Sequence, residues 1–420
     1  MKMNCITALE NKVFQVISDV SSELSVPAYV VGGFVRDYLL NIKNDDIDIV
    51  VEGSGIEFAK YFANKVNGKL SYYENYGTAM VKWEGIEVEF VGARKEMYER
   101  GSRNPIVEEG TLYDDISRRD FTINAMAISL NKGTYGDLVD FFGGLKDLNE
   151  HILRTPLNPD MTFSDDPLRM FRAVRFISKL TDFTIDENTI EGIKTNAYRS
   201  TILTRERITM ELEKMLSYTN PTDGLILLHD LGLWDYAFPN NEYSVNNVKA
   251  VGNSFDIDVR WFFLAYNYDG SYDSFTRAMK LPNKQSQILD KMYYTYNCFS
   301  RMDFPHLSVV RHCLEYSGYY AFKGLDSAFI HLRITQPNNG ANIVDWYGYT
   351  TSIFHENTAF VNYNLICNGN EISEWSGLQP GILLGKLIKT VKEKILDGEL
   401  NNSRDSIYAY VRHNKMCKNF

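Results

Sequence analysis

Two aspartates separated by a single residue, Asp46 and Asp48, are the first candidates for chemistry in this chain. They lie in a short apolar segment, Asp46–Val51, that is typical of a buried strand. Side chains alternate across a strand, so we expect both carboxylates on one face and Ile47 in the core. Two neighbouring carboxylates repel unless a cation lies between them, and Mg²⁺ prefers oxygen ligands. The pair therefore predicts a metal site, with a solvated strand entrance as the simpler alternative.

A glycine pair, Gly32 and Gly33, lies upstream of the two aspartates, between a strand-like run and a predicted helix that contains Arg36. Glycine lets a backbone approach a phosphate closely, and a helix N-terminus offers free N–H groups. A glycine pair alone is more often a plain turn. Followed by a helix and the carboxylate pair, it predicts phosphate donors beside metal ligands.

A third carboxylate is expected from the strand-like run Ile86–Val91. Glu87 and Glu89 share one face of this run, and we favour Glu89 as the additional catalytic group. The alternative is an exposed edge strand.

A mixed charged and apolar stretch, Arg118–Ala125, reads RRDFTINA. Asp120 could simply open a helix. In the functional interpretation, Arg119 and Asp120 bind the phosphates and sugar hydroxyls of a nucleotide.

A predicted helix after Asp166 and Pro167 carries Arg169, Arg172 and Arg175 at every third position. This spacing predicts that the three arginines line one side of the helix. The rest of the helix is apolar, which indicates burial, and buried arginines need anionic partners. Phosphates of a nucleotide or of RNA would serve, whereas a solvated basic face is the alternative.

The elements that must position these residues form an α+β chain, with a small mixed sheet and helices followed by an all-helical body and tail. Prolines interrupt the periodicity near Leu153–Thr162. The expected domains are a catalytic head at 1–155, a helical nucleotide-recognition neck at 156–220, a helical body at 221–365 and a helical tail at 366–420.

Composition excludes several classes of protein. With 44% hydrophobic and 13% aromatic residues the chain can bury sizeable cores, which excludes wholesale disorder. No apolar run approaches the roughly 20 residues of a membrane span, and five scattered cysteines fit reduced thiols, so we expect a cytoplasmic protein without a membrane anchor. The net charge of −10 by itself argues against nucleic-acid binding. Basic residues near the C-terminus oppose that argument.

Two other clusters of potential metal ligands do not have the spacing of a metal site. Around His306, His312 and Cys313 the spacing fits no zinc pattern. The pair His229–Asp230 lies in an ordinary helical stretch, and no second histidine cluster follows it.

Taken together, these stretches resemble the class II tRNA nucleotidyltransferases, a family of the DNA polymerase β-like superfamily that includes CCA-adding enzymes and bacterial poly(A) polymerases. The resemblance rests on motifs that follow one another in order along this chain, which are GGFVRD, DID, RRDFTINA, DFFGGLKDL, DDPLRMFRAVRF, RERITMEL and the tail stretches GLQPG and DGELN. It covers residues 27–216 and resumes near 368–403, while residues 240–365 match nothing recognisable.

The resemblance implies a polymerase β-like head in which Asp46 and Asp48 hold Mg²⁺ for attack of an RNA 3′-hydroxyl on a nucleotide. Gly33 and Arg36 would bind its phosphates, and Arg119 with Asp120 its sugar region. The implied nucleotide-binding residues are Gly32, Gly33, Arg36, Arg119, Asp120, Asp166, Arg169, Arg172 and Arg175, and the implied catalytic residues are Asp46, Asp48 and Glu89.

In the family, Asp166 and Arg169 would replace a nucleic-acid template. Asp offers only acceptors and Arg only donors, which complements cytosine and adenine. Uracil and guanine would leave buried groups unpaired, at about 1–3 kcal/mol each.

The implied function is addition or repair of the 3′-terminal CCA of tRNA with CTP and ATP. Partial addition of CC or A and poly(A) synthesis are alternatives within the same chemistry, and an inactive RNA-binding protein is one from another class. The segment Arg94–Thr111, where the family keeps a flexible loop, favours full CCA addition. We expect the tail to bind tRNA and no protein partner to be needed.

Overall fold

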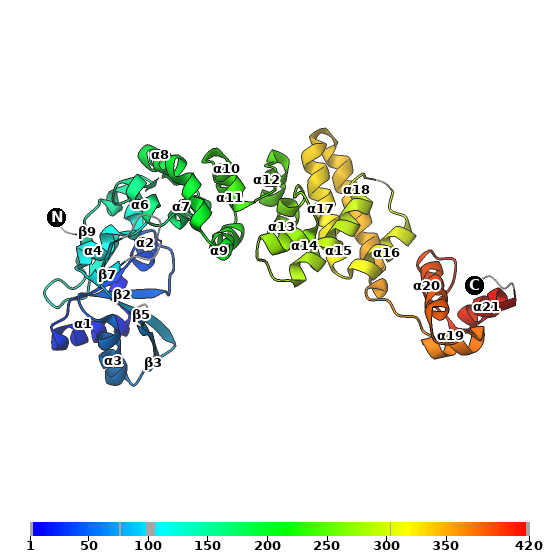
Figure 1. Cartoon of the computed structure of the whole chain (residues 1–420), viewed down its shortest axis with the longest axis horizontal. Helices are drawn as coiled ribbons and strands as arrows, with labels where there is room; N and C mark the ends of the chain where they lie inside the picture. The colour runs from blue at the N-terminus through cyan, green and yellow to red at the C-terminus, as the bar shows by residue number, and fades with distance from the viewer. Residues whose placement is uncertain (1–2, 75–76, 98–105, 303, 417–420) are drawn as a thin grey trace. The chain divides into compact units, whose positions relative to one another are not determined.

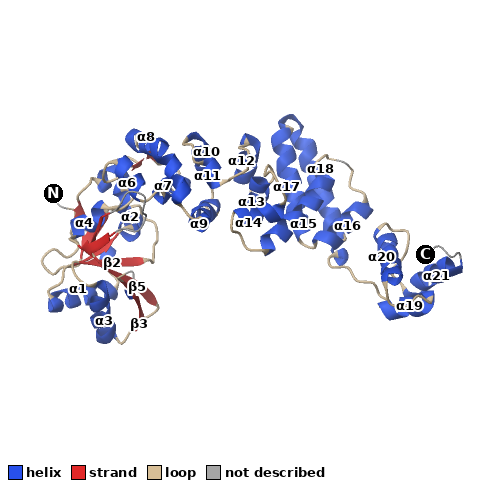
Figure 2. Cartoon of the chain, in the orientation of Figure 1, coloured by secondary structure: helices blue, strands red, loops and turns tan. Residues whose placement is uncertain are grey.

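The computed structural model describes residues 3–74, 77–97, 106–302 and 304–416 (Figure 1). The chain divides into two compact units, of which the first comprises Met1–Met215 and Asp223–Ala237 and the second Leu216–Thr222 and Phe238–Phe420. The named strands of the described residues lie in the first unit, and the second is helical (Figure 2). The predicted α+β class is confirmed. The four expected domains remain a prediction.

A mixed seven-stranded sheet forms the centre of the first unit, in the order β3-β4-β5-β2-β1-β8-β9. Its strands are β1 (Ala28–Val31), β2 (Ile47–Val51), β3 (Lys69–Tyr73), β4 (Thr78–Trp83), β5 (Ile86–Gly92), β8 (Met126–Ser129) and β9 (Leu138–Asp140). β2 and β5 pair in parallel, and the other neighbours pair antiparallel. A separate hairpin, β6 (Arg94–Met97) with β7 (Ile106–Glu109), occupies part of the expected flexible loop, whose residues 98–105 lie outside the described residues.

Helix α3 (Gly55–Val66) covers the sheet with an aromatic face. Ser54 caps its first turn by accepting a hydrogen bond from Glu57 N–H, and Asn67 ends it in a left-handed conformation. Phe58 and Phe62 are fully buried and contact Phe90 of β5, with ring centroids 5.6 and 5.2 Å apart. This packing holds the strands that carry the predicted carboxylates.

The other helices of the first unit surround the sheet or follow it in sequence. They are α1 (Lys12–Leu24), α2 (Gly33–Leu39), α4 (Leu112–Ser117), α5 (Gly144–Asn149), α6 (Pro159–Asp165), α7 (Leu168–Lys179), α8 (Glu187–Asn196), α9 (Arg205–Leu216), α10 (Thr222–Asp230) and α11 (Trp234–Ala237), with 3₁₀ turns at Ile6–Leu9, Thr122–Asn124 and Ala197–Ile202. One short parallel pair, β10 (Ile152–Leu153) with β11 (Thr184–Ile185), interrupts the region expected to be all-helical.

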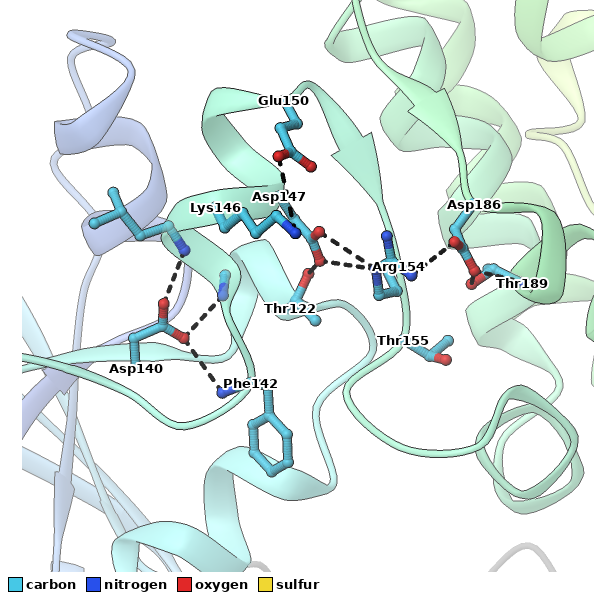
Figure 3. Close-up of polar contacts among 12 residues, drawn as sticks. Thr122, Asp140, Phe142, Lys146, Asp147, Glu150, Arg154, Thr155, Asp186 and Thr189 are labelled. Carbon is cyan, nitrogen blue, oxygen red and sulfur yellow. Dashed lines mark hydrogen bonds and ion pairs between the residues drawn. The ribbon is translucent and has the colours of Figure 1, made fainter.

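A polar cluster fixes the 3₁₀ turn Thr122–Asn124 from behind (Figure 3). The buried carboxylate of Asp147 accepts hydrogen bonds from Thr122 Oγ1 at 2.7 Å and from Arg154 Nε at 3.2 Å. Arg154 also pairs with Asp186 at 2.7 Å, and Asp186 caps α8. The turn that follows Asp120 is therefore tied to α5 and α8.

The second unit consists of helices. Its helices are α12 (Val245–Gly252), α13 (Ile257–Ala265), α14 (Tyr272–Ala278), α15 (Lys284–Phe299), α16 (Leu307–Ser317), α17 (Tyr320–Thr335), α18 (Gly340–Glu356), α19 (Gly369–Ser376), α20 (Ile382–Leu396) and α21 (Arg404–Met416). Trp261, Phe262 and Phe263 of α13 are buried and form part of the core of this unit. The last three helices share a separate cluster that includes Leu387, Val391 and Ile407. Among the described residues, none of the helices combines the length and apolarity that crossing a membrane requires.

Replacing Gly144 by alanine tests the fixation of the Thr122 turn. A Cβ at Gly144 would lie 2.2 Å from the Thr122 carbonyl oxygen, so the turn must move. We expect Gly144→Ala to lower the free energy of unfolding by about 3 kcal/mol in urea denaturation. At Gly133 an added Cβ meets no atom within 4 Å, so Gly133→Ala should change stability by less than about 0.5 kcal/mol. Equal losses in the two variants would contradict the steric argument.

Candidate active site

Two neighbouring strands present the predicted carboxylates on one face of the sheet. The parallel register of β2 and β5 places Asp48 directly beside Glu89. Ile47 and Val88 are buried, as the alternation along each strand predicts. Asp46 precedes β2 and is exposed, whereas Asp48 and Glu89 are half-buried.

The two half-buried carboxylates have raised pKa values. Burial raises the pKa of Asp48, the guanidinium of Arg119 opposes this rise, and the negative charge of Asp46 adds to it. Burial also raises the pKa of Glu89, and the charge of Asp48 adds to it. Within the described part of the chain no hydrogen bond or ion pair engages the carboxylates of Asp48 or Glu89. Neither carboxylate is therefore engaged in a direct polar contact by the described residues.

The chemistry of this donor set fits a divalent metal ion. Asp46 and Asp48 offer only acceptor oxygens, the ligand type that Mg²⁺ prefers. No three His, Cys, Asp or Glu side chains of the described residues converge closely enough to hold a metal ion by themselves. Glu87, the alternative to Glu89, is instead paired with Lys82 of β4.

The glycine pair makes room for an arginine. Gly32 precedes α2 with φ +71°, a conformation that favours glycine. A Cβ at Gly32 would lie 2.6 Å from Arg119 Nη1, so a larger residue would displace that guanidinium. Gly33 begins α2 and lines the same cavity.

Arg36 of α2 is buried and its charge is balanced. Its Nε donates to Asp37 Oδ1 at 2.7 Å, and its Nη1 donates to Asn124 Oδ1 at 2.6 Å. The carboxylate of Asp37 also accepts from Asn44 at 2.9 Å and from Lys179 at 3.3 Å. Arg36 is therefore held in one orientation.

A buried aspartate holds the two arginines of the RRD motif. Asp115 of α4 pairs with Arg118 at 2.5 Å and with Arg119 at 3.0 Å. Although burial would raise the pKa of Asp115, the charges of Arg119 and Arg118 bring it below its ordinary value. The carboxylate therefore stays ionised and orients both guanidinium groups.

Asp120 is the most strongly acidic of these groups. Its Oδ1 accepts from Phe121 N–H and Asn124 Nδ2, each at 2.9 Å, and its Oδ2 accepts from Arg172 Nε at 2.7 Å. Burial would raise the pKa of this carboxyl, but Arg172 and Asn124 hold it at about 2. Asp120, which was predicted to bind the sugar, is thus also the ion-pair partner of Arg172 in α7.

Asp166 and Arg169, the pair predicted to recognise the base, lie at the junction between α6 and α7. Asp166 has an extended backbone; its Oδ1 accepts from Leu168 N–H at 3.2 Å and its Oδ2 lies 3.6 Å from Arg207 Nη2. Arg169 is buried and donates to the carbonyls of Thr162 at 3.2 Å and Arg118 at 2.6 Å. Both side chains are fixed before any nucleotide is present.

One cavity of about 410 Å³ collects most of the predicted residues. It is lined by Gly32, Gly33, Arg36, Asp48, Arg118, Arg119, Asp120, Asn124, Asp166, Leu168, Arg169, Arg172, Phe176 and Arg207. Asp46, Glu89 and Arg175 are not among these lining residues. Arg175 donates instead to the buried carboxylate of Glu211 at 2.5 Å, and its role as a nucleotide ligand stays a prediction.

Four polar or aromatic lining residues were not assigned a role from the sequence: Arg118, Asn124, Phe176 and Arg207. Each lies inside a motif that the sequence analysis quoted. The motif pattern could not tell which of its side chains face the cavity.

In the second unit, the basic tail residues expected to bind tRNA are largely neutralised. Lys392 pairs with Glu315, Lys394 with Glu399 and Arg404 with Glu371. The structure gives no support to a zinc site at His306, His312 and Cys313, because His312 pairs with Asp397 at 3.0 Å. RNA binding by the tail stays a prediction.

Two family descriptions match the chain. The Poly A polymerase head domain matches residues 28–154, and the family described as the probable RNA and SrmB-binding site of polymerase A matches residues 182–243. The first match contains the sheet and its carboxylates.

Several individual proteins are similar to this chain in sequence or in structure. The CCA-adding enzyme of Geobacillus sp. (strain WCH70) is 30% identical over 401 residues, which are 93% of this chain and 94% of that enzyme. The A-adding tRNA nucleotidyltransferase of Geobacter sulfurreducens is 37% identical over 254 residues, 60% of this chain but 28% of that longer protein. The structure of the Thermotoga maritima CCA-adding enzyme complexed with tRNA superposes with a TM-score of 0.69, at 26% identity, and covers 99% of both chains.

The depressed pKa of Asp120 predicts a loss of stability in acid. A carboxyl with a folded pKa of about 2 stabilises the folded state above its unfolded pKa of about 3.9, and this contribution is lost as the pH falls towards 2. We expect the free energy of unfolding to fall by about 2 kcal/mol more in the native protein than in Asp120→Asn between pH 5 and about 2. Urea denaturation across this range measures the difference, and parallel pH profiles would contradict the assignment.

Proposed function

The chain belongs to the family of the CCA-adding enzymes and is a nucleotidyltransferase, and from this premise we propose that it completes or repairs the 3′-terminal CCA of tRNA with CTP and ATP. In this reaction the RNA 3′-hydroxyl attacks the α-phosphorus of the nucleotide and pyrophosphate leaves. The observation that carries the proposal is the single cavity in which Gly33, Asp48, Arg119 and Asp166 meet, although they come from widely separated stretches of the chain.

The arginines of the cavity are suited to the triphosphate. Arg118 and Arg119 are oriented by Asp115, and Arg172 is oriented by Asp120. A guanidinium group can bind a phosphate through two parallel hydrogen bonds, and prior orientation lowers the entropy lost on binding. We assign the phosphates to Arg118, Arg119 and Arg172, with Gly32 and Gly33 allowing close approach of the backbone.

Enzymes of this family use divalent metal ions, and we propose Mg²⁺ held by Asp46 and Asp48. When bound, such an ion lowers the pKa of the attacking hydroxyl and neutralises charge on the phosphates. The carboxylate of Asp48 makes no hydrogen bond or ion pair among the described residues, and Glu89 adds a further carboxylate beside it. Mg²⁺ is commonly bound by one or two carboxylates together with substrate phosphates, which suits the small number of protein ligands here.

The choice of base is assigned to Asp166 and Arg169. An acceptor beside donors complements the Watson–Crick edges of cytosine and adenine, and it opposes those of uracil and guanine. Arg169 is held by two backbone carbonyls, and the Asp166 carboxylate is oriented by Leu168 N–H and Arg207. Fixed groups reject a wrong base better than mobile ones because they cannot rearrange to satisfy it.

Partial addition is the second candidate function. The similarity to an A-adding enzyme over 254 residues is the observation that favours it. The match to a CCA-adding enzyme over nearly the whole chain favours full addition, which we prefer.

We also assign this activity to the cytoplasm. Support comes from the cysteines of the described residues, Cys5, Cys298, Cys313 and Cys367, which are free and fit a reducing compartment.

Extension of tRNA by single nucleotides tests the proposal. The purified protein with Mg²⁺ would receive transcripts that end before CCA, after C and after CC, together with CTP, ATP, UTP or GTP. We expect growth to CCA and then a stop, with no product from UTP or GTP. Asp48→Asn should lower the initial rate by at least about a hundredfold, because it removes a metal ligand.

Asp45→Asn is the matched control, because Asp45 is an exposed aspartate whose partner is Lys43. It should extend tRNA like the native protein. Addition of A alone or of CC alone would select partial activity, and a long A tail would select poly(A) synthesis. No extension by the native protein would refute the proposal.

Removing the Asp166 carboxylate should relax base choice. In Asp166→Ala no acceptor is left to distinguish an amino group from a carbonyl, so we expect the ratio of kcat/KM for CTP over UTP to fall about tenfold or more. Asp182→Ala removes an exposed carboxylate of the same unit and should leave this ratio unchanged. Steady-state kinetics with each nucleotide would show the difference, and an unchanged ratio in Asp166→Ala would reject the assignment.

A further inference from the structure

One aromatic ring lies at the back of the nucleotide cavity, where three guanidinium groups converge on it. From this geometry we infer that Phe176 is a positioning residue, which holds the arginines of α2 and α7 at the spacing that nucleotide binding requires. The inference rests on the proposed function, because it concerns the same cavity.

The contacts of Phe176 are made by cations from two elements. The guanidinium carbons lie 5.2 Å from the ring centroid for Arg36, 5.6 Å for Arg172 and 4.6 Å for Arg175. The ring is only 4% exposed, yet it contributes to the lining of the cavity. Buried cation–π contacts of this kind are stronger than those at exposed sites, because water does not compete for the cation.

The arginines around the ring carry like charges and would repel one another without compensation. Each has its own carboxylate, and the negative face of the ring adds to that neutralisation. Burial lowers the pKa of the nearby Lys179; the charges of Arg36 and Arg175 lower it further, and Asp37 opposes them. A saturated side chain of similar size would fill the same space and offer no negative face.

The ring of Phe176 lies between two helices that both contribute residues to the cavity. Arg36 comes from α2, which also carries Gly33, whereas Phe176 and Arg172 come from α7. The pair Lys179–Asp37 joins the same two helices at 3.3 Å. The ring thus sets the distance between the arginine of one helix and the arginine of the other.

The ring of Phe176 also contacts the segment that contains Asp120 and Phe121. Phe121, next to Asp120, packs edge-on against Phe176 with centroids 5.7 Å apart and an interplanar angle of 83°. Asp120 in turn orients Arg172. Phe176 therefore supports Arg172 directly and also through the carboxylate that pairs with it.

A test must separate this role from simple filling of space, because Phe176→Leu could unfold the domain. Phenylalanine carrying one, two or three fluorine atoms, introduced at position 176 by stop-codon suppression, weakens the negative face of the ring with little change in volume. We expect the Kd for CTP and for inorganic triphosphate, measured by calorimetry, to rise in steps and to reach about tenfold with three fluorines. The KM for CTP should follow, whereas kcat and the KM for tRNA should stay near their native values.

The same series at Phe163 is the control, since Phe163 is fully buried in α6 and no cation–π contact of the described residues involves it. Its fluorination should leave the affinity unchanged. If the protein extends tRNA but fluorination at position 176 does not change its affinity for CTP or triphosphate, the inference is overturned and the proposed function stands. A stepwise loss of affinity in a protein that does not extend tRNA would support the inference and refute the proposed function. Failure of the native protein to bind either ligand would overturn both.

Discussion

Neutralisation of buried arginines is the constraint on which the candidate site depends. A guanidinium removed from water without a partner is strongly destabilising, so an arginine-lined cavity folds only if the protein supplies the counter-charges. Here several of the counter-charges are carboxylates on or next to the cavity wall, as with Asp37 for Arg36 and Asp120 for Arg172. Because each partner lies on one side of its arginine, the arginine is also oriented. A chain with a net charge of −10 can in this way present a basic surface for an anion.

The strand face that carries Asp48 presents carboxylates instead. Those of Asp48 and Glu89 make no hydrogen bond or ion pair among the described residues, and their pKa values are raised. A triphosphate with its metal ion carries both kinds of charge, so its phosphates would suit the oriented arginines and its metal ion would suit the carboxylates. Arg119 lies between the two regions, because it influences the pKa of Asp48 and approaches the backbone of Gly32. This arrangement links the motif around the glycine pair to the motif that follows α4.

A proline sets the geometry of the base-reading pair. The residue before a proline is excluded from the helical region, so α6 ends there and Asp166 is extended, with φ −136° and ψ 98°. Pro167 then precedes α7, where its fixed φ is tolerated. Asp166 is therefore presented at a break between two helices, and Arg169 follows in the first turn of the second. A continuous helix through this point would have placed the two side chains differently.

Much of this protein was determined by local sequence. Ser54 and Asn67, which bound α3, are local signals for its extent. Alternation along each strand likewise predicts which face of β2 carries Asp48 and which face of β5 carries Glu89, because these patterns depend on the geometry of one segment. Pairing between segments had to come from the tertiary structure. Arg169 and Arg175 are six residues apart, so their side chains point about 120° apart around the helix. Arg175 does not line the cavity because it pairs with Glu211, and the local sequence of α7 does not reveal that contact. Which carboxylate neutralises which arginine is decided by contacts between distant segments, and those contacts exist only once the chain has folded.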